Sequence, residues 1–377
     1  MKVELEAITN FGLEAVLKRE LEGLAYEDIK VSDGLLSLRG NLEDIGRLNL
    51  WLRTAERVHL VLARFPAYTF DQLYENTKKI PWADFIPRDG NFITDPKSQK
   101  SKLYSLSDIQ RIVEKALVDK LNQTYHQGWF EKTGPRYRVG IRIFKDEATL
   151  FLDTSGEGLH DRGYRQRSVE APLTETMASA LVQLSFWKPD RMFLDPFCGS
   201  GTLPIEAALL ARNIAPGLNR SFDFEAWPFL RDMDWKGLKK EAFGAINYQD
   251  PLNILATDIN PRAIRSASYN VGVLGLEDDI RLEVKDIRDL EIKEDYGVII
   301  TNPPYGVRIE DEASVKKLNQ ALGRFMKAHP TWSTYAISGA PHFERDLGKK
   351  ADRKRKLYNG RIRTDYYQYY GPKPKRS

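Results

Sequence analysis

The chain has 377 residues, of which 42% are apolar and 29% charged, a composition typical of a globular protein with two or three hydrophobic cores. No signal-peptide core opens the sequence and no uncharged apolar run approaches membrane-spanning length, so we expect a cytoplasmic protein without membrane segments. One cysteine excludes an internal disulfide, and the five histidines lack metal-ligand spacing, so no metal site is expected.

The formal net charge of +4 is unevenly distributed along the chain. Residues 344–377 carry +8, which leaves −4 for all the others. Basic clusters of this kind attract phosphate backbones without sequence preference. We therefore consider Arg353, Lys354 and Arg355 as part of a nucleic-acid-binding face. A solvated, partly disordered tail is the alternative interpretation, and it is favoured for residues 373–377.

Two small units are predicted before a glycine-containing break at 155–158. The first comprises residues 1–65 and the second residues 66–155. Apolar spacing predicts the following segments within them: a helix over 13–21, a strand at 36–38, a helix over 42–52, a helix over 107–121, and strands over 137–144 and 148–153.

Beyond residue 156, predicted strands and helices alternate. The expected segments are a helix over 172–187, a strand over 192–195, a helix over 203–212, a strand over 254–258, a helix over 262–271, strands over 281–285 and 297–301, and a helix over 314–328. Strands that alternate with helices favour a parallel-rich, doubly wound α/β sheet. The connection 213–250 is long for such a fold, and we expect either a helical insertion or a lid over the site.

The strand expected over 297–301 is followed by Asn302-Pro303-Pro304-Tyr305-Gly306. The prolines have no N–H and disfavour helix in the residue before them, so the chain leaves the strand extended with unpaired carbonyls. Asn302 adds a side-chain acceptor and Tyr305 adds a flat aromatic face. Two acceptors beside a stacking ring suit a planar –NH2 group on a conjugated system. Accepting both N–H bonds out of its plane would direct the nitrogen lone pair at an electrophile. A proline-rich turn without chemistry is the alternative.

The strand over 192–195 ends in Asp195 and turns through Gly199-Ser200-Gly201 into a helix. The glycines permit close approach of a ligand, and the helix N-terminus offers free N–H groups. Three further strand ends carry Asp258, Asp286 and Asn302. A carboxylate at 258 suits ribose hydroxyls, and one at 286 suits an adenine amino group. Each acid alone would be interpreted as a helix cap or turn residue, but the ordered series predicts a nucleotide-type site.

The composition of this site distinguishes between cofactors. A dinucleotide fingerprint requires a third glycine at the position of Pro204, and no phosphate-binding Gly-x4-Gly-Lys occurs. S-adenosyl-L-methionine has no pyrophosphate, and its positive sulfonium suits an acid-lined site. We therefore predict S-adenosyl-L-methionine as cofactor. The expected reaction is direct attack of an exocyclic amino nitrogen on the sulfonium methyl group.

The order of these motifs resembles the class I amino-methyltransferases. The matching segments are Asp195-Pro196-Phe197-Cys198-Gly199-Ser200-Gly201-Thr202, Thr257-Asp258-Ile259-Asn260, Asp286, and the run from Thr301 to Gly306. The segments Arg162-Gly163-Tyr164-Arg165 and Ala171-Pro172-Leu173 are similar to the THUMP-domain RNA methyltransferases. Within these, the sequence most resembles the guanine-N2 methylase half of RlmL and its YpsC-like relatives, often labelled N6-adenine-specific DNA methylases. The resemblance spans nearly the whole chain and is weaker in the N-terminal half.

The resemblance implies three domains and a set of site residues. A ferredoxin-like domain would occupy residues 1–65, a THUMP RNA-binding domain 66–155, and a Rossmann-like methyltransferase domain 156–377. The implied cofactor-binding residues are Asp195, Phe197, Cys198, Gly199, Gly201, Asp258, Ile259, Asp286 and Asn302. The implied residues around the target base are Asn302, Pro303, Pro304 and Tyr305. Arg162, Tyr164 and Arg165 would contact RNA or cofactor, with a salt-bridged linker between domains as the alternative.

The resemblance implies methylation of an exocyclic amino group in RNA, with guanine N2 of 23S rRNA, free or in a large-subunit precursor, as the first candidate. Adenine N6 in DNA or RNA stays open, because Asn-Pro-Pro-Tyr also occurs in methylases of DNA adenine and of release-factor glutamine. The N-terminal half favours RNA. A non-catalytic RNA-binding or ribosome-assembly module is the alternative outside the enzymes.

Overall fold

The computed structural model describes residues 2–167, 173–305, 312–360 and 362–374. Its contacts divide the chain into two compact units. The first unit consists of Met1–Thr9, Leu21–Leu159 and Arg220–Glu241, and the second of Asn10–Glu20, His160–Asn219 and Ala242–Ser377. Each unit therefore combines segments that are far apart in the sequence. In the described ranges, no helix has both the length and the apolar character needed to cross a membrane.

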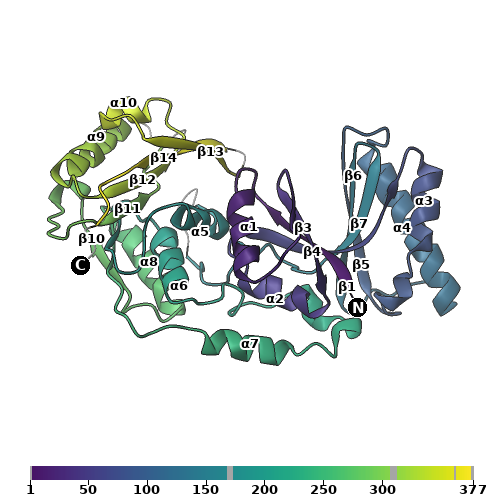
Figure 1. The fold of residues 1–377 in the computed structure, drawn as a ribbon. Coiled ribbons are helices and arrows are strands. Elements are labelled where there is room, and N and C mark those ends of the chain that lie inside the picture. The colour runs from purple at the N-terminus through teal and green to yellow at the C-terminus, as the bar shows by residue number, and fades with distance from the viewer. Residues whose placement is uncertain (1, 168–172, 306–311, 361, 375–377) are drawn as a thin grey trace. The chain divides into compact units, whose positions relative to one another are not determined.

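The first unit is built on one seven-stranded sheet, in the order β2-β3-β1-β4-β7-β6-β5 (Figure 1). Its strands are β1 (Lys2–Thr9), β2 (Lys30–Ser32), β3 (Leu35–Asn41), β4 (Ala55–Pro66), β5 (Asn91–Gln99), β6 (Arg136–Phe144) and β7 (Glu147–Asp153). Its helical segments are α2 (Glu43–Trp51), α3 (Phe70–Lys79), η1 (Trp82–Asp84) and α4 (Leu106–Tyr125). Because β4 pairs with both β1 and β7, the two predicted N-terminal domains share a continuous sheet.

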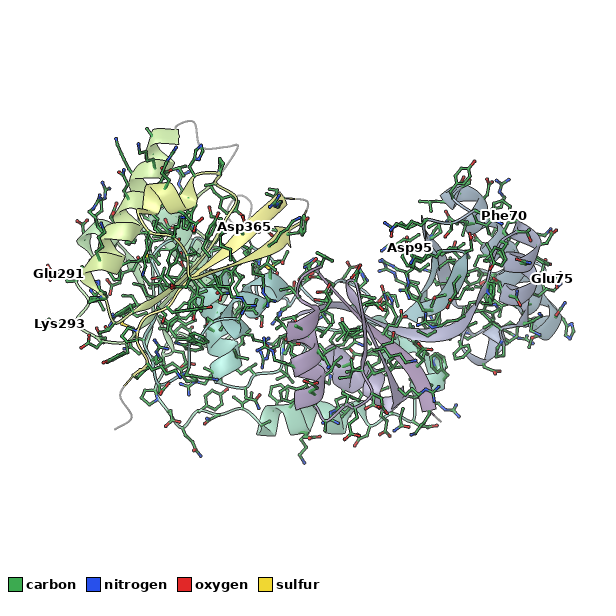
Figure 2. The ribbon with its side chains drawn as sticks, turned by 45° about the horizontal axis from the view of Figure 1, so that its top comes forward. Phe70, Glu75, Asp95, Glu291, Lys293 and Asp365 are labelled. Carbon is green, nitrogen blue, oxygen red and sulfur yellow. The ribbon has the colours of Figure 1, made fainter. Side chains whose placement is uncertain are left out.

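The edge strand β5 was not predicted from the sequence. Asp95, Pro96 and Lys97 interrupt its apolar alternation, and Figure 2 marks Asp95 on it. Proline donates no ladder hydrogen bond and is tolerated on an edge strand, which is where β5 lies, paired in parallel with β6. A strand with one partner needs less apolar surface than a central one, so its sequence signal is weak.

The long connection 213–250 contains three helical segments, η2 (Asp223–Ala226), η3 (Pro228–Leu230) and α7 (Trp235–Gly244). Residues 220–241 belong to the first unit. There the Trp227 ring stacks on Tyr137 with 5.1 Å between centroids, and its Nε1 donates to the Arg136 carbonyl at 2.8 Å. This segment is therefore a helical insertion that packs on the sheet of the first unit, and these contacts do not support the lid alternative.

The second unit contains a second seven-stranded sheet, in the order β10-β9-β8-β11-β12-β14-β13. Its strands are β8 (Phe193–Asp195), β9 (Ile254–Asp258), β10 (Ile280–Val284), β11 (Val298–Thr301), β12 (Ser333–Ser338), β13 (Arg353–Asn359) and β14 (Ile362–Tyr369). The first five are parallel and β14 is antiparallel to β12 and β13. The predicted doubly wound, parallel-rich sheet is thus confirmed.

Helices cover both faces of the second sheet. They are α5 (Glu175–Gln183), α6 (Thr202–Ala211), α8 (Pro261–Val273), α9 (Glu312–Ala328) and α10 (Phe343–Leu347), with the short turn η4 (Ile287–Asp289). Figure 1 shows α5, α6 and α8 on one face and α9 with α10 on the other. On the latter face Leu194, Leu255 and Ile299 share a core with Leu322 and Phe325 of α9. Burial on both faces explains why β8 and β11 are short, continuous apolar runs.

Candidate functional site

The strand order of the second unit reverses between β8 and β11. From β8 the chain continues outward through β9 and β10, and it then returns to form β11 on the other side of β8. In open α/β sheets, ligands bind at such a switch point, outside the carboxyl ends of the strands. The polar residues that follow β10, β9, β8 and β11 at this edge are, in spatial order, Asp286, Asp258, Asp195 and Asn302.

Asp195 ends β8 and is only 1% exposed. Its Oδ1 accepts a hydrogen bond from Thr301 Oγ1 at 2.6 Å and from the Phe197 N–H at 3.2 Å. Burial raises the pKa of this carboxyl to about 7, although both hydrogen bonds lower it. The Thr301–Asp195 bond joins the two strands that flank the switch point, and the carboxyl there changes charge near neutral pH.

The glycine turn between β8 and α6 requires its two glycines for different reasons. Both have positive φ, +53° at Gly199 and +85° at Gly201, a region that favours glycine. A Cβ on Gly201 would also lie 3.1 Å from Cβ of Ala267 in α8, so the turn packs closely on that helix. Cys198, directly before Gly199, is buried, and burial raises the pKa of its thiol well above the usual value. The turn brings the N-terminus of α6 to the strand ends.

Asp258 ends β9 beside this turn. Its Oδ2 accepts the Gly199 N–H at 3.0 Å and its Oδ1 accepts the Asn260 N–H at 2.8 Å. Each carboxylate oxygen can accept a further hydrogen bond, as two ribose hydroxyls require. The next residue, Ile259, is 63% exposed, a large apolar side chain that an adenine ring would cover.

Asp286 follows β10 and forms a bidentate pair with Arg288. Its Oδ1 accepts from Arg288 Nε at 2.8 Å and its Oδ2 from the terminal guanidinium nitrogen at 2.6 Å. This hydrogen-bonded guanidinium lowers the pKa of the Asp286 carboxyl. The side chain is therefore an ionised acceptor, the state needed to bind an amino group.

The segment after β11 contains an acceptor for which the described residues supply no donor. Asn302 Oδ1 is buried and has no hydrogen-bond partner among the residues that the structure describes. Pro303 is buried, and Pro304 and Tyr305 are half-buried. Most buried polar atoms in native proteins are hydrogen-bonded, so an exception at a switch point is a candidate position for a ligand donor. Gly306 of this motif lies outside the described residues, as do Ala171 and Pro172.

Arg162 and Tyr164, predicted to contact RNA or cofactor, are buried in the structure. Their side chains are 2% and 1% exposed and bind Glu206 of α6, at 2.7 Å from the Arg162 guanidinium and 3.0 Å from the Tyr164 hydroxyl. Arg165 forms an ion pair with Glu175 at 3.0 Å. Buried charges require such partners, so these side chains fix the 162–165 segment to α5 and α6.

The basic segment of β13 has mixed environments. Arg353 is exposed, whereas the Lys354 ammonium pairs with Glu344 at 2.8 Å and stays half-exposed. The Arg355 guanidinium donates to the Gly12 carbonyl at 3.2 Å. Contact of these three residues with RNA stays a prediction, and Lys354 and Arg355 are already engaged in hydrogen bonds within the chain.

Sequence reasoning missed Asn270, which supports the glycine turn. It is fully buried, and its Nδ2 donates to the Ser200 carbonyl at 3.1 Å and the Arg167 carbonyl at 2.8 Å. The available signal was its position beside Val271 on the apolar face of the helix, where a polar residue is unusual. Asn270 thus connects α8, the glycine turn and the segment after Arg165.

Three family models match the chain. Residues 162–368 match the RMKL-like methyltransferase domain, residues 4–59 the RlmL ferredoxin-like domain, and residues 67–153 the THUMP domain. The first match contains all four strand ends of the site. Apart from residues 10–20, the other two lie in the first unit, and β4 spans the gap between their matched ranges.

Relatives match over almost the whole chain. "Putative RNA methyltransferase YpsC" of Bacillus subtilis (strain 168) is 45% identical over 98% of this chain and 96% of its own length. The ribosomal RNA large subunit methyltransferase K/L of Syntrophotalea carbinolica is 34% identical over 93% of this chain, which spans 51% of that longer protein. Among solved structures, that of SMU.472, "a putative methyltransferase complexed with SAH", has a TM-score of 0.93 and 39% identity and covers 99% of each chain.

The site described above fits S-adenosylmethionine, whose demethylated product is S-adenosylhomocysteine (SAH). It combines a glycine turn, three carboxylates at adjacent strand ends, an exposed Ile259 and the Asn302 acceptor, which has no donor among the residues that the structure describes. The chain belongs to the RMKL-like family of S-adenosylmethionine-dependent methyltransferases, and it carries RlmL ferredoxin-like and THUMP domains in its N-terminal half.

Proposed function

We propose that this protein methylates an exocyclic amino group of an RNA base, namely guanine N2 in 23S rRNA. The observation that carries the proposal is the buried Oδ1 of Asn302, which has no hydrogen-bond donor in the described part of the chain. It lies at the switch point next to Asp195, beside a half-buried aromatic ring, that of Tyr305. An amino group of a base supplies the missing donor.

The three acids position the cofactor. When bound, S-adenosylmethionine supplies an electrophilic methyl group. Asp258 would accept the ribose hydroxyls with its remaining lone pairs, Ile259 would contact the adenine, and Asp286 would accept the adenine amino group. The glycine turn permits close approach of the ligand backbone. Asp195 would contribute a carboxyl that compensates the positive charge of the ligand when ionised.

The Asn-Pro-Pro-Tyr segment orients the target amino group. Asn302 Oδ1 and the Pro303 carbonyl accept its two N–H bonds and stabilise the positive charge that develops on nitrogen. Tyr305 offers a face for the base, which must leave its stack or pair to enter the site. No strong base is required beforehand, because the product ammonium is acidic and loses its proton afterwards.

The comparisons support RNA as substrate. A THUMP domain matches residues 67–153, and both named relatives are described as RNA methyltransferases, one of them of large-subunit ribosomal RNA. Proteins commonly read structured RNA at unpaired, splayed bases, which suits a catalytic site preceded by a separate RNA-binding domain. Guanine N2 is proposed from the likeness to the RlmL half of such enzymes.

A methylation assay tests the proposal directly. The purified protein is incubated with isotopically labelled S-adenosylmethionine and one of three substrates. These are rRNA from a strain that lacks the gene for this protein, genomic DNA, and release factor. We expect labelled N2-methylguanosine in 23S rRNA, identified by nucleoside mass spectrometry and absent from the other substrates. Labelled N6-methyladenine would instead identify the N6 amino group of adenine as the target. No transfer to any substrate, and no thermal stabilisation by saturating cofactor, would favour a non-catalytic RNA-binding module.

A further inference from the structure

The Tyr305 ring occupies space beside Gly339, the first residue after β12. A Cβ built on Gly339 would lie 2.9 Å from Cδ2 and 3.0 Å from Cε2 of the ring. Optimal carbon–carbon contacts are about 3.5–4.0 Å, so the ring fills the volume that a side chain at position 339 would need. The end of β12 thus contributes to the surroundings of the target-base segment, although it carries no polar site residue.

Space explains the glycine at position 339 better than backbone conformation does. Gly199 and Gly201 have positive φ, whereas φ of Gly339 lies outside that region. An alanine could therefore adopt the backbone conformation of Gly339 without strain. Its effect would come from the contact with Tyr305.

The β13–β14 hairpin borders the same ring. Ser338, just before Gly339, pairs with Asp365 of β14, which Figure 2 labels, and the Arg363 carbonyl lies 3.6 Å from the Cβ position of Gly339. At the end of β13, the Asn359 side chain hydrogen-bonds to the Tyr305 hydroxyl. Burial raises the pKa of this phenol, and the bond to Asn359 partly opposes the shift. The ring is therefore confined by two neighbouring elements.

We propose that Gly339 is a positioning residue for methyl transfer: by lacking a side chain, it determines where the Tyr305 ring lies and hence where the target base stacks. The β13–β14 hairpin completes this wall of the base site. The inference rests on the proposed function, because it assumes that Tyr305 receives the base.

Substitution Gly339→Ala tests the contact. The new methyl group displaces the ring, and a misplacement of up to about 1 Å can lower turnover about 10²-fold. We expect kcat with rRNA to fall by about 10- to 100-fold. The affinity for S-adenosylhomocysteine, measured by calorimetry, should change less than about twofold, because its acids follow other strands. Gly244→Ala is the matched control, since nothing lies within 4 Å of a Cβ at that position.

A double-mutant cycle shows whether Gly339 acts through the ring. Tyr305→Ala removes the ring and with it the clash, so Gly339→Ala should change kcat less than about twofold in that background. The double variant should also regain any thermal stability that Gly339→Ala alone loses. Additive effects, or a double variant that stays unfolded, would overturn the positioning role.

A crystal structure of Gly339→Ala with S-adenosylhomocysteine adds a readout that needs no substrate. The expected result is a displaced Tyr305 ring beside unchanged acids at 195, 258 and 286. A variant with wild-type kcat and KM would refute the inference and leave the methyltransferase proposal intact. If the wild-type protein methylates none of the three substrates while the ring still moves, the proposed function itself fails, and the positioning role fails with it.

Discussion

At the scale of single residues, the site retains polar atoms that the fold does not satisfy. An unsatisfied buried acceptor costs about 1–3 kcal/mol, and Asn302 Oδ1 is such an atom within the described residues. Removing it should lower activity without lowering stability. We expect Asn302→Ala to reduce kcat by roughly 10²–10³-fold, the scale of losing one preorganised polar contact. Cofactor affinity by calorimetry and the Tm should be preserved.

Asn319 in α9 provides a matched control for Asn302. It is a buried asparagine, and its Oδ1 and Nδ2, like the Oδ1 of Asn302, have no hydrogen-bond partner in the described ranges. It lies outside the strand-end series, so Asn319→Ala should leave kcat unchanged. Turnover near the wild-type value in Asn302→Ala would exclude the proposed role of that amide.

The Asp195 carboxyl should make cofactor binding depend on pH. Its pKa in the folded state is about 7, above the ordinary value of 3.8. Between these two pH values the ligand-free folded state binds more protons than the unfolded state, so the protein gains stability as the pH falls from about 7 towards 3.8. A positively charged ligand favours the carboxylate instead. Affinity should therefore fall by about tenfold per pH unit below 7, with proton release on binding. Calorimetry in buffers of different protonation enthalpy measures both.

Two variants separate Asp195 from the other acids. Asp195→Asn should bind the cofactor more weakly and without this pH dependence. Asp286→Asn should retain it, because Arg288 keeps the pKa of Asp286 below its usual value and that group does not titrate near pH 7. Affinity of the wild-type protein that is constant between about pH 5.5 and 8.5 would contradict the role of Asp195.

At the scale of elements, local patterns predicted the strand ends of the site. An apolar run followed by an acid, a glycine turn or Asn-Pro-Pro-Tyr is contained within about ten residues, and β8, β9, β10 and β11 were placed in this way. Contacts between distant segments could not be predicted. The Thr301–Asp195 bond joins residues 106 positions apart, and Gly339 is recognisable only from its approach to Tyr305.

The contact that holds the insertion on the first sheet was likewise not predictable from the sequence, and it can be tested by mutation. Trp227 is 1% exposed and packs on Tyr137 in the sheet of the first unit. Trp227→Ala should destabilise that unit by about 3–5 kcal/mol, the usual cost of truncating a buried tryptophan. Trp129→Ala, at an 80% exposed tryptophan of the same unit, should cost less than about 0.5 kcal/mol. Urea unfolding followed by circular dichroism measures both, and equal midpoints would refute the anchoring role.

At the scale of the whole molecule, each unit contains part of the chain that the domain pattern assigns elsewhere. Residues 10–20 belong to the second unit, where Gln183 donates to Glu20 at 2.6 Å and Arg355 to the Gly12 carbonyl. Residues 220–241 belong to the first unit. A cut near residue 159 therefore removes contacts from both units, although the sequence suggests a domain boundary there.

We accordingly expect neither fragment 1–159 nor fragment 160–377 to fold as well as the intact chain. The first lacks the insertion with Trp227, and the second lacks residues 10–20 and exposes the apolar face of that insertion. Hydrogen exchange of each purified fragment should show faster exchange in β6 and β13 than in the full chain. Fragments whose amides are protected as well as in the intact chain would show that residues 10–20 and 220–241 are dispensable for the packing of the two units.

The placement of residues 10–20 in the second unit and of residues 220–241 in the first also constrains the order in which the protein can fold during synthesis. Trp227 is translated 91 positions after Arg136, whose carbonyl accepts its hydrogen bond. The hydrogen bond between Gly12 and Arg355 can form only after a further 343 positions have been translated beyond Gly12. Domains usually fold one after another as they leave the ribosome. Here the first unit lacks the insertion until residue 241 has been translated, whereas the second unit needs its last hairpin, β13–β14, to complete its sheet. The first unit can therefore complete its packing before the second, whose final packing belongs to the last stage of translation.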